Sequence, residues 1–449
     1  MPQKRIIIVG GVGGGATVAA QIRRTDQDSE IMMFEKCGYI SFANCGMPYH
    51  IGGTVEKRDT LLYPVEKFAG KYNVQVNIRS EVTSINRFKK TITYKKKETI
   101  QEVHYDKLIL SPGASPVVPQ VEGIDNSRTF ALRTIEDMDR IIEFINSSKP
   151  VSVTVAGAGF IGMEMLGNLQ ALGLDCTIVD RSSQLVGNLD KEVSEIIEGH
   201  LKEKGVNIIL NDGLQAFGDD GRTLLLNSGE KIKADMTILA IGIKPNTELA
   251  TGASLELGST GAIAVNDYMQ TSDPDIYALG DAVETKDFLT GSPRYIALAW
   301  PAHRQAYIIA SHLNGGQTPY HANQGSAILK VFDLTVALTG HSSKTLAEEG
   351  IDFKETFLPS YSHAAYYPGS EKLWIKIFYS KESGLLYGAN VVGFDGVDKR
   401  MAVLATAIKG KLTIADLPEL ELGYSPAYSS SKDPINSIGY KALSEWNKE

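Results

Sequence analysis

One cysteine stands in a setting that suits a reactive thiol. Cys45 lies in the stretch GYISFANCGMPYHIGG, about ten residues after Glu35. A reactive thiol needs a lowered pKa, which a helix N-terminus supplies, and the segment CGMPYHIGG can begin a helix. The alternative is a small buried apolar residue, which suits Cys176 inside a predicted strand and, to a lesser degree, Cys37 just after one. We predict a redox role for Cys45.

A glycine turn in the middle of the chain indicates nucleotide binding. Gly157, Gly159 and Gly162 form a GxGxxG pattern between the strand VSVTVA and the helix FIGMEMLGNLQAL. Glycines there allow a tight turn, and a pyrophosphate can sit at the helix N-terminus, where N–H groups and the dipole favour anions. A turn used for packing alone is the alternative. Asp180 ends the next strand and favours NADH, whereas Arg181 beside it favours the 2′-phosphate of NADPH, so both stay open.

A second glycine turn, GGVGGG, follows the first strand of the chain. Gly10 and Gly15 occupy the outer positions of the same pattern, but Val12 replaces the middle glycine. Glu35 ends the next strand, where its carboxylate can accept hydrogen bonds from ribose hydroxyls. The positions that we assign to this cofactor are Gly10, Gly13, Gly15, Glu35 and Lys36.

A third acidic position points to a flavin. Gly280 and Asp281 follow the apolar strand IYAL, and a carboxylate there can reach the ribityl hydroxyls of a flavin. A short acidic cap after a strand is the alternative. Two dinucleotide sites in one chain mean that electrons pass from one cofactor to another. The sequence therefore predicts FAD together with NADPH or NADH.

Composition excludes several other functions. The net charge of −8 argues against a general nucleic-acid surface. No apolar run approaches the roughly 18–20 residues needed to span a bilayer, and the N-terminus lacks the pattern of a signal peptide, which predicts a cytoplasmic protein. Three cysteines without a CxxC pair, and eight histidines without HxxxH or HExxH spacing, predict no metal site.

The order of predicted elements gives an α/β fold with two Rossmann-like dinucleotide-binding domains and a C-terminal α+β dimerisation domain. A β–turn–α–β unit fills the first 36 residues and returns at residues 150–182, and antiparallel strands begin near Gln324. The predicted boundaries are 1–113 and 258–323 for a discontinuous FAD domain, 114–257 for the NAD(P) domain and 324–449 for the dimerisation domain.

Several long motifs carry a family resemblance. With its two glycine turns, SFANCG, LILSPGASP, TSDPDIYALGD and YSPAYSSSKD, the chain resembles the flavoprotein disulfide reductases with two dinucleotide-binding domains over its whole length. QIRR, LAWPAHR, HAAYYPG and YSPAYSSSKDPINSIGYKA are most similar to coenzyme A disulfide reductases. That superfamily often has a CxxxxC redox pair, but Ile40 and His50 stand five residues either side of Cys45. A lone cysteine must hold its oxidised state as a mixed disulfide, a sulfenic acid or a persulfide.

The resemblance implies a substrate site. Cys45 would form a mixed disulfide with CoA, and Tyr366 or Tyr424 would protonate or hold the leaving thiolate. The family is homodimeric, and each active site uses C-terminal residues of the partner. Arg23 adds a further cation on the first helix. The positions that match family substrate residues are Thr17, Gln21, Arg24, Ser41, Asn44, His303, Tyr366, Tyr424 and Lys432.

Other functions fit the same residues. The alternatives on this scaffold are an NADH oxidase or peroxidase and a polysulfide or CoA-persulfide reductase. A flavin-bound redox sensor without catalysis is a further alternative. The two tyrosines can also serve as interface packing, and Arg23 and Arg24 as a solvated helix face.

Overall fold

The structure is a computed structural model that describes residues 3–448. Contacts between residues divide the chain into two units. The first unit comprises Met1–Val117, Leu132–Ser147 and Ile243–Asn323, and the second comprises Val118–Ala131, Ser148–Gly242 and Gln324–Glu449. The three-domain boundaries given above stay a prediction beside this division.

A five-stranded parallel sheet in the order β19–β7–β1–β2–β3 organises the first unit. The four residues after Arg5 in the central strand RIIIV are apolar and buried, because both faces of the sheet are covered, as is usual for parallel sheets. The strands are β1 (Arg5–Val9), β2 (Glu30–Phe34), β3 (Gln75–Asn77), β7 (Lys107–Leu110) and β19 (Ile276–Ala278).

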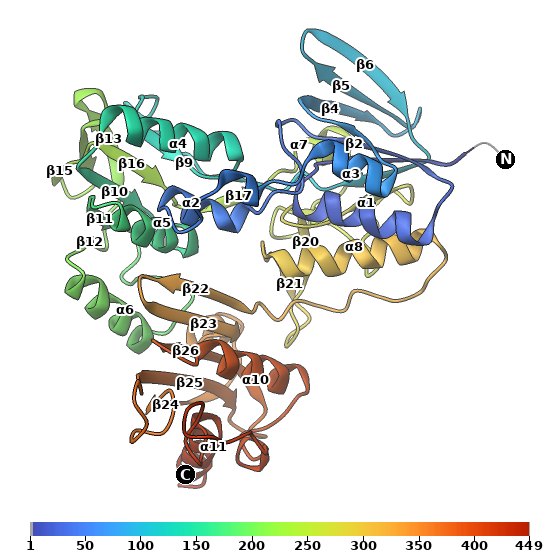
Figure 1. Ribbon diagram of the computed structural model, residues 1–449. Coiled ribbons are helices and arrows are strands. Elements are labelled where there is room, and N and C mark those ends of the chain that lie inside the picture. Colours follow the sequence, from blue (N-terminus) through green and yellow to red (C-terminus); the bar gives the residue numbers. More distant parts are fainter. Residues whose placement is uncertain (1–2, 449) are drawn as a thin grey trace. The chain divides into compact units, whose positions relative to one another are not determined.

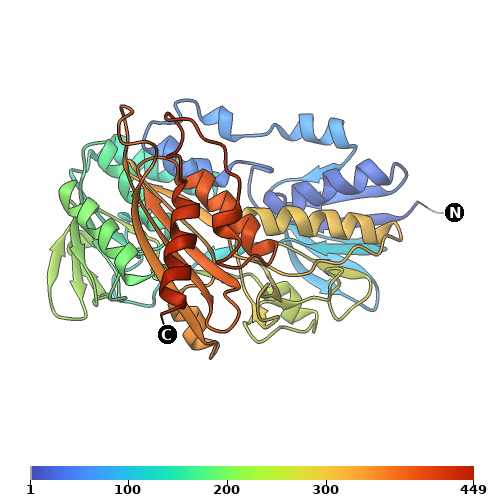
Figure 2. The ribbon, with the colours of Figure 1, turned by 90° about the horizontal axis from the view of Figure 1, so that it is seen from below.

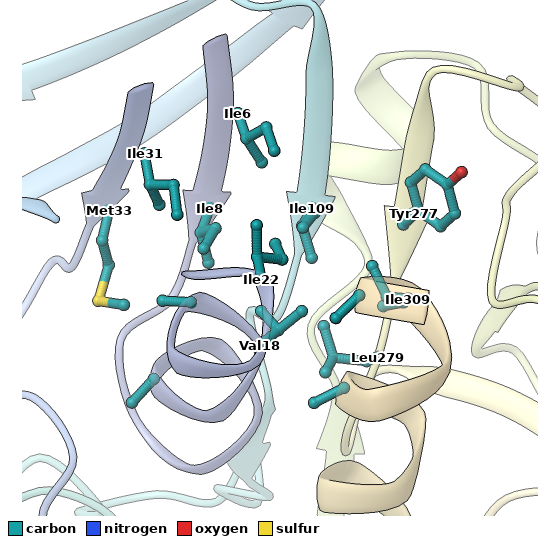
Figure 3. Packing of buried hydrophobic residues seen from close by; sticks show 14 of the residues in the cluster. Ile6, Ile8, Val18, Ile22, Ile31, Met33, Ile109, Tyr277, Leu279 and Ile309 are labelled. Atoms are coloured by element: carbon teal, nitrogen blue, oxygen red, sulfur yellow. The ribbon is translucent and has the colours of Figure 1, made fainter. Parts of the chain in front are cut away.

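Alternate residues of these strands serve two different cores. Ile8 and Ile109 pack with Val18 and Ile309 of two helices, α1 (Gly13–Thr25) and α8 (Ala299–Leu313). Figure 3 shows the two helices side by side against this face of the sheet. Ile7 belongs to the opposite core, with residues of an antiparallel sheet that comprises β4 (Ser80–Asn86), β5 (Thr91–Lys96) and β6 (Thr99–His104).

Short elements complete the first unit. β8 pairs with β17, and β18, β20 and β21 form a small mixed sheet. The bounds are η1 (Asn44–Gly46), α2 (Met47–Ile51), η2 (Arg58–Leu61), α3 (Val65–Tyr72), β8 (Ala114–Pro116), α4 (Ile135–Ser148), β17 (Ile243–Pro245), α7 (Glu248–Gly252), β18 (Ile263–Ala264), β20 (Val283–Lys286) and β21 (Pro293–Arg294).

The second unit contains another five-stranded parallel sheet, in the order β12–β11–β10–β16–β9. Strand β10, the glycine turn after it and helix α5 repeat the strand–turn–helix order of β1 and α1, as the sequence predicts. The elements of this part are β9 (Thr129–Ala131), β10 (Ser152–Ala156), α5 (Phe160–Ala171), β11 (Asp175–Val179), α6 (Lys191–Glu203), β12 (Asn207–Ile209), β13 (Leu214–Gly218), η3 (Asp219–Gly221), β14 (Thr223–Leu226), β15 (Lys231–Lys233) and β16 (Met236–Leu239).

An antiparallel sheet in the order β22–β23–β26–β25–β24 forms the C-terminal part of the second unit (Figure 1). Helix α10 contacts β23 and β26, and α11 contacts β24; Figure 2 shows these two red helices lying over the orange strands. The bounds are β22 (Ala327–Val331), β23 (Leu334–Gly340), α9 (Ser343–Glu348), β24 (Phe353–Tyr361), β25 (Lys372–Ser380), β26 (Leu386–Gly393), α10 (Val397–Lys409), η4 (Leu417–Glu419) and α11 (Pro434–Trp446).

The predicted fold class is confirmed by these sheets: two parallel sheets with glycine turns, followed by an antiparallel sheet with helices. Among the helices of the described residues, none has the length and apolar character needed to cross a membrane.

A buried ion pair organises the C-terminal part. Arg400 is 1% exposed, and its guanidinium donates to the Asp433 carboxylate at 2.8 Å and to the Ser362 carbonyl at 2.9 Å. Asp433 also caps α11 by accepting the N–H of Ile435 at 2.9 Å, and Ser429 donates to it at 2.6 Å. One arginine thereby ties the loop after β24 to the loop before α11.

We expect Asp433→Asn to lower the free energy of unfolding by about 3 kcal/mol at pH 7, because it leaves the Arg400 charge buried without its partner. Burial would raise the pKa of Asp433, but hydrogen bonds from Arg400, Ile435 and Ser429 lower it below its usual range. The pair therefore stabilises the fold above the unfolded-state pKa of about 3.9, and this stabilisation is lost as pH falls through the folded-state pKa. Urea unfolding at several pH values measures both effects.

Glu195→Gln is the matched control. It removes a carboxylate from an exposed pair with Lys191 on α6, and such pairs contribute at most about 1 kcal/mol. A difference between wild type and Asp433→Asn that stays constant down to the lowest pH at which the fold survives would contradict the assignment.

Candidate active site

Cys45 lies at the surface, in the 3₁₀ turn η1 directly before α2. The predicted helix exists, but it begins at Met47, so the thiol precedes the helix instead of opening it. The Cys45 Sγ lies 3.9 Å from the Asn44 side-chain oxygen. The structure thus brings two predicted site residues, Asn44 and Cys45, into one exposed turn.

The loop before Cys45 is fixed to the first glycine turn. The N–H of Ser41 donates to the carbonyl of Gly11 at 2.9 Å. Ser41 has a φ of 48°, a left-handed conformation that is uncommon outside glycine and indicates local strain held by its surroundings. Ser41, Asn44 and Cys45 therefore belong to a loop that is hydrogen-bonded to the chain just before α1 begins.

The other two cysteines have environments that disfavour a thiolate. Burial, followed by the charges of Glu35 and Glu136, raises the pKa of Cys37 to about 12. Burial also raises the pKa of Cys176 to about 12, and its side chain is enclosed in β11 as predicted. Since the thiolate is the nucleophile, these two residues are poor candidates for disulfide chemistry.

The first glycine turn has no room for side chains at its outer positions. A Cβ at Gly10 would lie 2.0 Å from the Ser111 carbonyl, and one at Gly15 would lie 1.8 Å from the Gly10 carbonyl. At Gly13, by contrast, no described atom would lie within 4 Å of a Cβ, so the first turn of α1 is open. A close turn with an open helix N-terminus fits the diphosphate of a dinucleotide.

Glu35 closes this turn. Its carboxylate is buried and accepts the N–H groups of Gly11 and Cys37, each at 2.8 Å. Every carboxylate oxygen keeps a further lone pair, so ribose hydroxyls can still bind here. Lys36, next in the chain, is exposed.

The second turn repeats this geometry. A Cβ at Gly157 would lie 2.2 Å from the Ala240 carbonyl, and one at Gly162 would lie 1.9 Å from the Gly157 carbonyl. Gly159, like Gly13, has no described atom within 4 Å of a Cβ. Asp180 accepts the N–H of Ala158 at 2.6 Å, as Glu35 does in the first turn. The residues present therefore fit a dinucleotide at each turn.

Asp281 has neighbours that the sequence did not indicate. Burial raises the pKa of Asp281, and the opposing charge comes from Arg133, whose Nη2 lies 3.6 Å from the carboxylate. Tyr295 donates to the Asp281 carbonyl at 2.9 Å, and Gln305 accepts the N–H of Gly280 at 2.8 Å. Arg133 precedes Asp281 by 148 positions, so no spacing rule could have paired them.

Two predicted substrate residues meet across α1 and α8. Thr17 Oγ1 donates to the Gly13 carbonyl at 2.6 Å and lies 2.9 Å from Nδ1 of His303. Gln21 and Arg24 lie four and seven residues after Thr17, so all three residues share one face of α1. Arg24 is exposed at the end of this face.

Arg23 is not part of that face, which corrects the expectation that it is a substrate cation or a solvated residue. Its side chain is buried and donates to four backbone carbonyls, of residues Asp26, Ser29, Tyr72 and Asn73. The guanidinium therefore joins the end of α1 to the end of α3. Of the two adjacent arginines, only Arg24 is available to a ligand.

Tyr366 and Tyr424, in the second unit, form a pair. Their hydroxyl oxygens lie 3.0 Å apart, and the side chains are 75% and 50% exposed. The hydrogen bond with Tyr424 raises the pKa of Tyr366. Lys432 is exposed, and its Nζ lies 4.8 Å from the centroid of the Tyr440 ring. The Arg400 contacts hold the two loops that carry these residues.

Two family models match the chain. "Pyridine nucleotide-disulphide oxidoreductase" matches residues 4–306, and the "Pyridine nucleotide-disulphide oxidoreductase, dimerisation domain" matches residues 326–433.

Individual relatives cover nearly the whole chain. A protein of Staphylococcus aureus strain JH9 named coenzyme A disulfide reductase is 38% identical over 98% of this chain and 99% of its own. The structure of reduced CoADR-RHD from Bacillus anthracis has a TM-score of 0.98 and 45% identity, covering 100% of this chain and 81% of that one. An NAD-dependent persulfide reductase from A. fulgidus has a TM-score of 0.96 and 34% identity, covering 99% and 84%.

We expect Gly15→Ala to bind less flavin and to lower the free energy of unfolding by about 3 kcal/mol, because its Cβ would overlap the Gly10 carbonyl. Flavin absorbance per chain and urea unfolding measure the two effects.

Gly70→Ala is the matched control, since no described atom lies within 4 Å of a Cβ at that exposed position of α3. It should leave flavin binding intact and change stability by no more than about 1 kcal/mol, in the stabilising direction. Full flavin content and wild-type stability in Gly15→Ala would refute the close approach at this turn.

Proposed function

The chain belongs to the pyridine nucleotide-disulphide oxidoreductase family, and on that premise we propose that it reduces CoA disulfide to two CoA at the expense of NADPH or NADH. It is a flavoprotein oxidoreductase that acts on a disulfide, with FAD and a nicotinamide nucleotide as cofactors. The observation that carries the substrate is the exposed thiol of Cys45, in a loop whose Ser41 N–H donates to Gly11 just before α1 begins. We also propose the cytoplasmic location that the sequence predicts.

Each cofactor has a set of residues that would hold it. FAD would lie at the first turn, with Gly10, Gly13, Gly15, Glu35 and Lys36, and would reach Gly280 and Asp281. The nicotinamide nucleotide would lie at the second turn, with Gly157, Gly159, Gly162, Asp180 and Arg181. When bound, the two cofactors supply the two electrons that the reaction consumes.

Cys45 performs the sulfur chemistry in this proposal. Its thiolate attacks one sulfur of CoA disulfide, so that a Cys45–CoA disulfide forms, the substrate S–S bond breaks and one CoA thiolate leaves. Two electrons then break the Cys45–CoA disulfide, which releases the second CoA and restores the Cys45 thiolate. Each CoA thiolate takes up one proton, so one nicotinamide nucleotide and one proton are consumed per disulfide.

Tyr366 and Tyr424 are proposed to hold or protonate the leaving thiolate. Their hydroxyl oxygens lie 3.0 Å apart, so one hydroxyl can donate to a sulfur anion while it accepts a hydrogen bond from the other. We propose that they act on Cys45 of the partner subunit in a homodimer, and that Lys432 binds CoA from the same side. Ser41, Asn44, Thr17, Gln21, Arg24 and His303 would form the remainder of the CoA site.

A second candidate is supported by one of the structural neighbours. The A. fulgidus protein is named a persulfide reductase, so a CoA persulfide is an alternative substrate of the same thiol. In that case Cys45 would carry a persulfide sulfur instead of CoA between turnovers.

We expect Cys45→Ser to abolish reduction of CoA disulfide while full FAD remains bound, because serine cannot form the mixed disulfide. Flavin absorbance and nicotinamide oxidation with CoA disulfide measure both properties.

In the wild type, we expect the intact mass before and after dithiothreitol to differ by one CoA. A mass difference of one sulfur atom would favour the persulfide reaction, and a mass difference of one oxygen atom would favour an oxidase or peroxidase.

Cys37→Ala is the control, because that thiol is half-buried and disfavoured as a thiolate. It should retain activity and the CoA adduct. Substantial CoA-disulfide reduction by Cys45→Ser would refute the role of Cys45.

A mixed dimer tests whether the site is shared. Cys45→Ser and the double variant Tyr366→Phe, Tyr424→Phe should each be nearly inactive as homodimers, since loss of an acid catalyst costs at least about a hundredfold. If the site uses both subunits, a heterodimer of the two has one complete site, with Cys45 from one chain and the tyrosines from the other. Activity of the purified heterodimer therefore supports a shared site, and a heterodimer as inactive as its parents rejects it.

A further inference from the structure

Helices α1 and α8 lie side by side, and their exposed and half-buried side chains form one strip, which comprises Thr17, Gln21, Arg24, His303, Arg304 and Tyr307. Thr17 lies 2.9 Å from His303 near the start of both helices, and Asn314 donates to the Thr25 hydroxyl at 2.8 Å near their ends. Because both contacts advance along the chain together, the helices run parallel. Figure 3 shows them side by side under the sheet. Residues one turn beyond Thr17 and His303 must therefore lie at the same level.

Those residues are Gln21 on α1 and Tyr307 on α8. Tyr307 is 48% exposed although the residues that follow it, Ile308 and Ile309, are fully buried. The guanidinium carbon of Arg304 lies 5.1 Å from the centroid of the Tyr307 ring, so the arginine covers the ring while its charge stays near the surface.

We infer that Tyr307 and Arg304 bind the nucleotide end of the CoA substrate, an inference that rests on the proposed function. The adenine would stack on the exposed part of the Tyr307 ring, and the phosphates would pair with Arg304 and with the exposed Arg24. Apart from the imidazole of His303, none of the residues that match the family's substrate positions is an aromatic on this strip, so an adenine platform at Tyr307 is new to the site.

The dimensions of the strip agree with this assignment. Its first end lies at Gly13, next to the loop that carries Cys45, and Arg24 lies eleven residues further, about 17 Å along the helix. A long thiol with its sulfur at Cys45 would lay its pantetheine arm past Thr17 and His303. Its anionic end would then reach the two arginines.

Truncated substrate separates this subsite from the reaction itself. Pantethine, the disulfide of pantetheine, has the same reacting arm without the nucleotide. We expect Tyr307→Leu and Arg304→Met each to raise KM for CoA disulfide about tenfold, the effect of one charge-assisted or stacking contact, with kcat unchanged. The kcat/KM for pantethine should stay at the wild-type value.

Arg140→Met and Phe88→Leu are the controls, since they remove an exposed cation and an exposed aromatic from the same unit outside the strip. They should change neither substrate. An unchanged KM for CoA disulfide in both strip variants, or equal losses with both substrates, would overturn the inference.

Calorimetric titration with adenosine 3′,5′-bisphosphate keeps the two proposals distinguishable. Weaker binding to Tyr307→Leu and Arg304→Met than to wild type supports the subsite without any turnover, and equal binding rejects it. A wild type that does not reduce CoA disulfide would instead reject the proposed function.

Discussion

The absence of a side chain at four glycines is the constraint on which the rest of the structure depends. At Gly10, Gly15, Gly157 and Gly162 a Cβ would lie between 1.8 and 2.2 Å from a backbone carbonyl. Strand and helix can therefore approach closely at both turns, and the first turns of both helices stay open at Gly13 and Gly159, where no described atom would lie within 4 Å of a Cβ. The same approach sets the start of α1, and with it the positions of Thr17, Gln21 and Arg24 along that helix.

The sulfur chemistry depends on the first of these turns. Gly11 accepts the N–H of Ser41, and its own N–H is held by Glu35. The Cys45 loop is thus attached to the same residue of the glycine turn that Glu35 holds. The backbone of the Cys45 loop and that of the first glycine turn are therefore linked directly.

Sequence patterns found the sheets and the glycine turns because these follow from short-range rules: apolar runs for buried strands and glycines at fixed offsets. They also singled out Cys45, since its loop carries a specific motif; its exposure agrees with that role, which stays a prediction. They could not separate Arg23 from Arg24, because adjacent residues on a helix face in different directions and only the fold brings four carbonyls around Arg23. Arg133 was missed for the same reason, because its neighbour Asp281 comes from a distant segment.

The two acids at the strand ends have a structural role that precedes any choice of nucleotide. Glu35 accepts the N–H of Gly11, and Asp180 accepts those of Ala158 and Ser182, so each acid closes its own turn. The presence of Asp180 is therefore explained by backbone hydrogen bonding, and it does not by itself specify NADH. The Arg181 side chain is instead exposed and lies over Gly213. A Cβ at Gly213 would lie 2.7 Å from the Cγ of Arg181. Gly213 thus leaves room for the Arg181 side chain next to Asp180, so neither the acid nor the arginine decides by itself between NADH and NADPH.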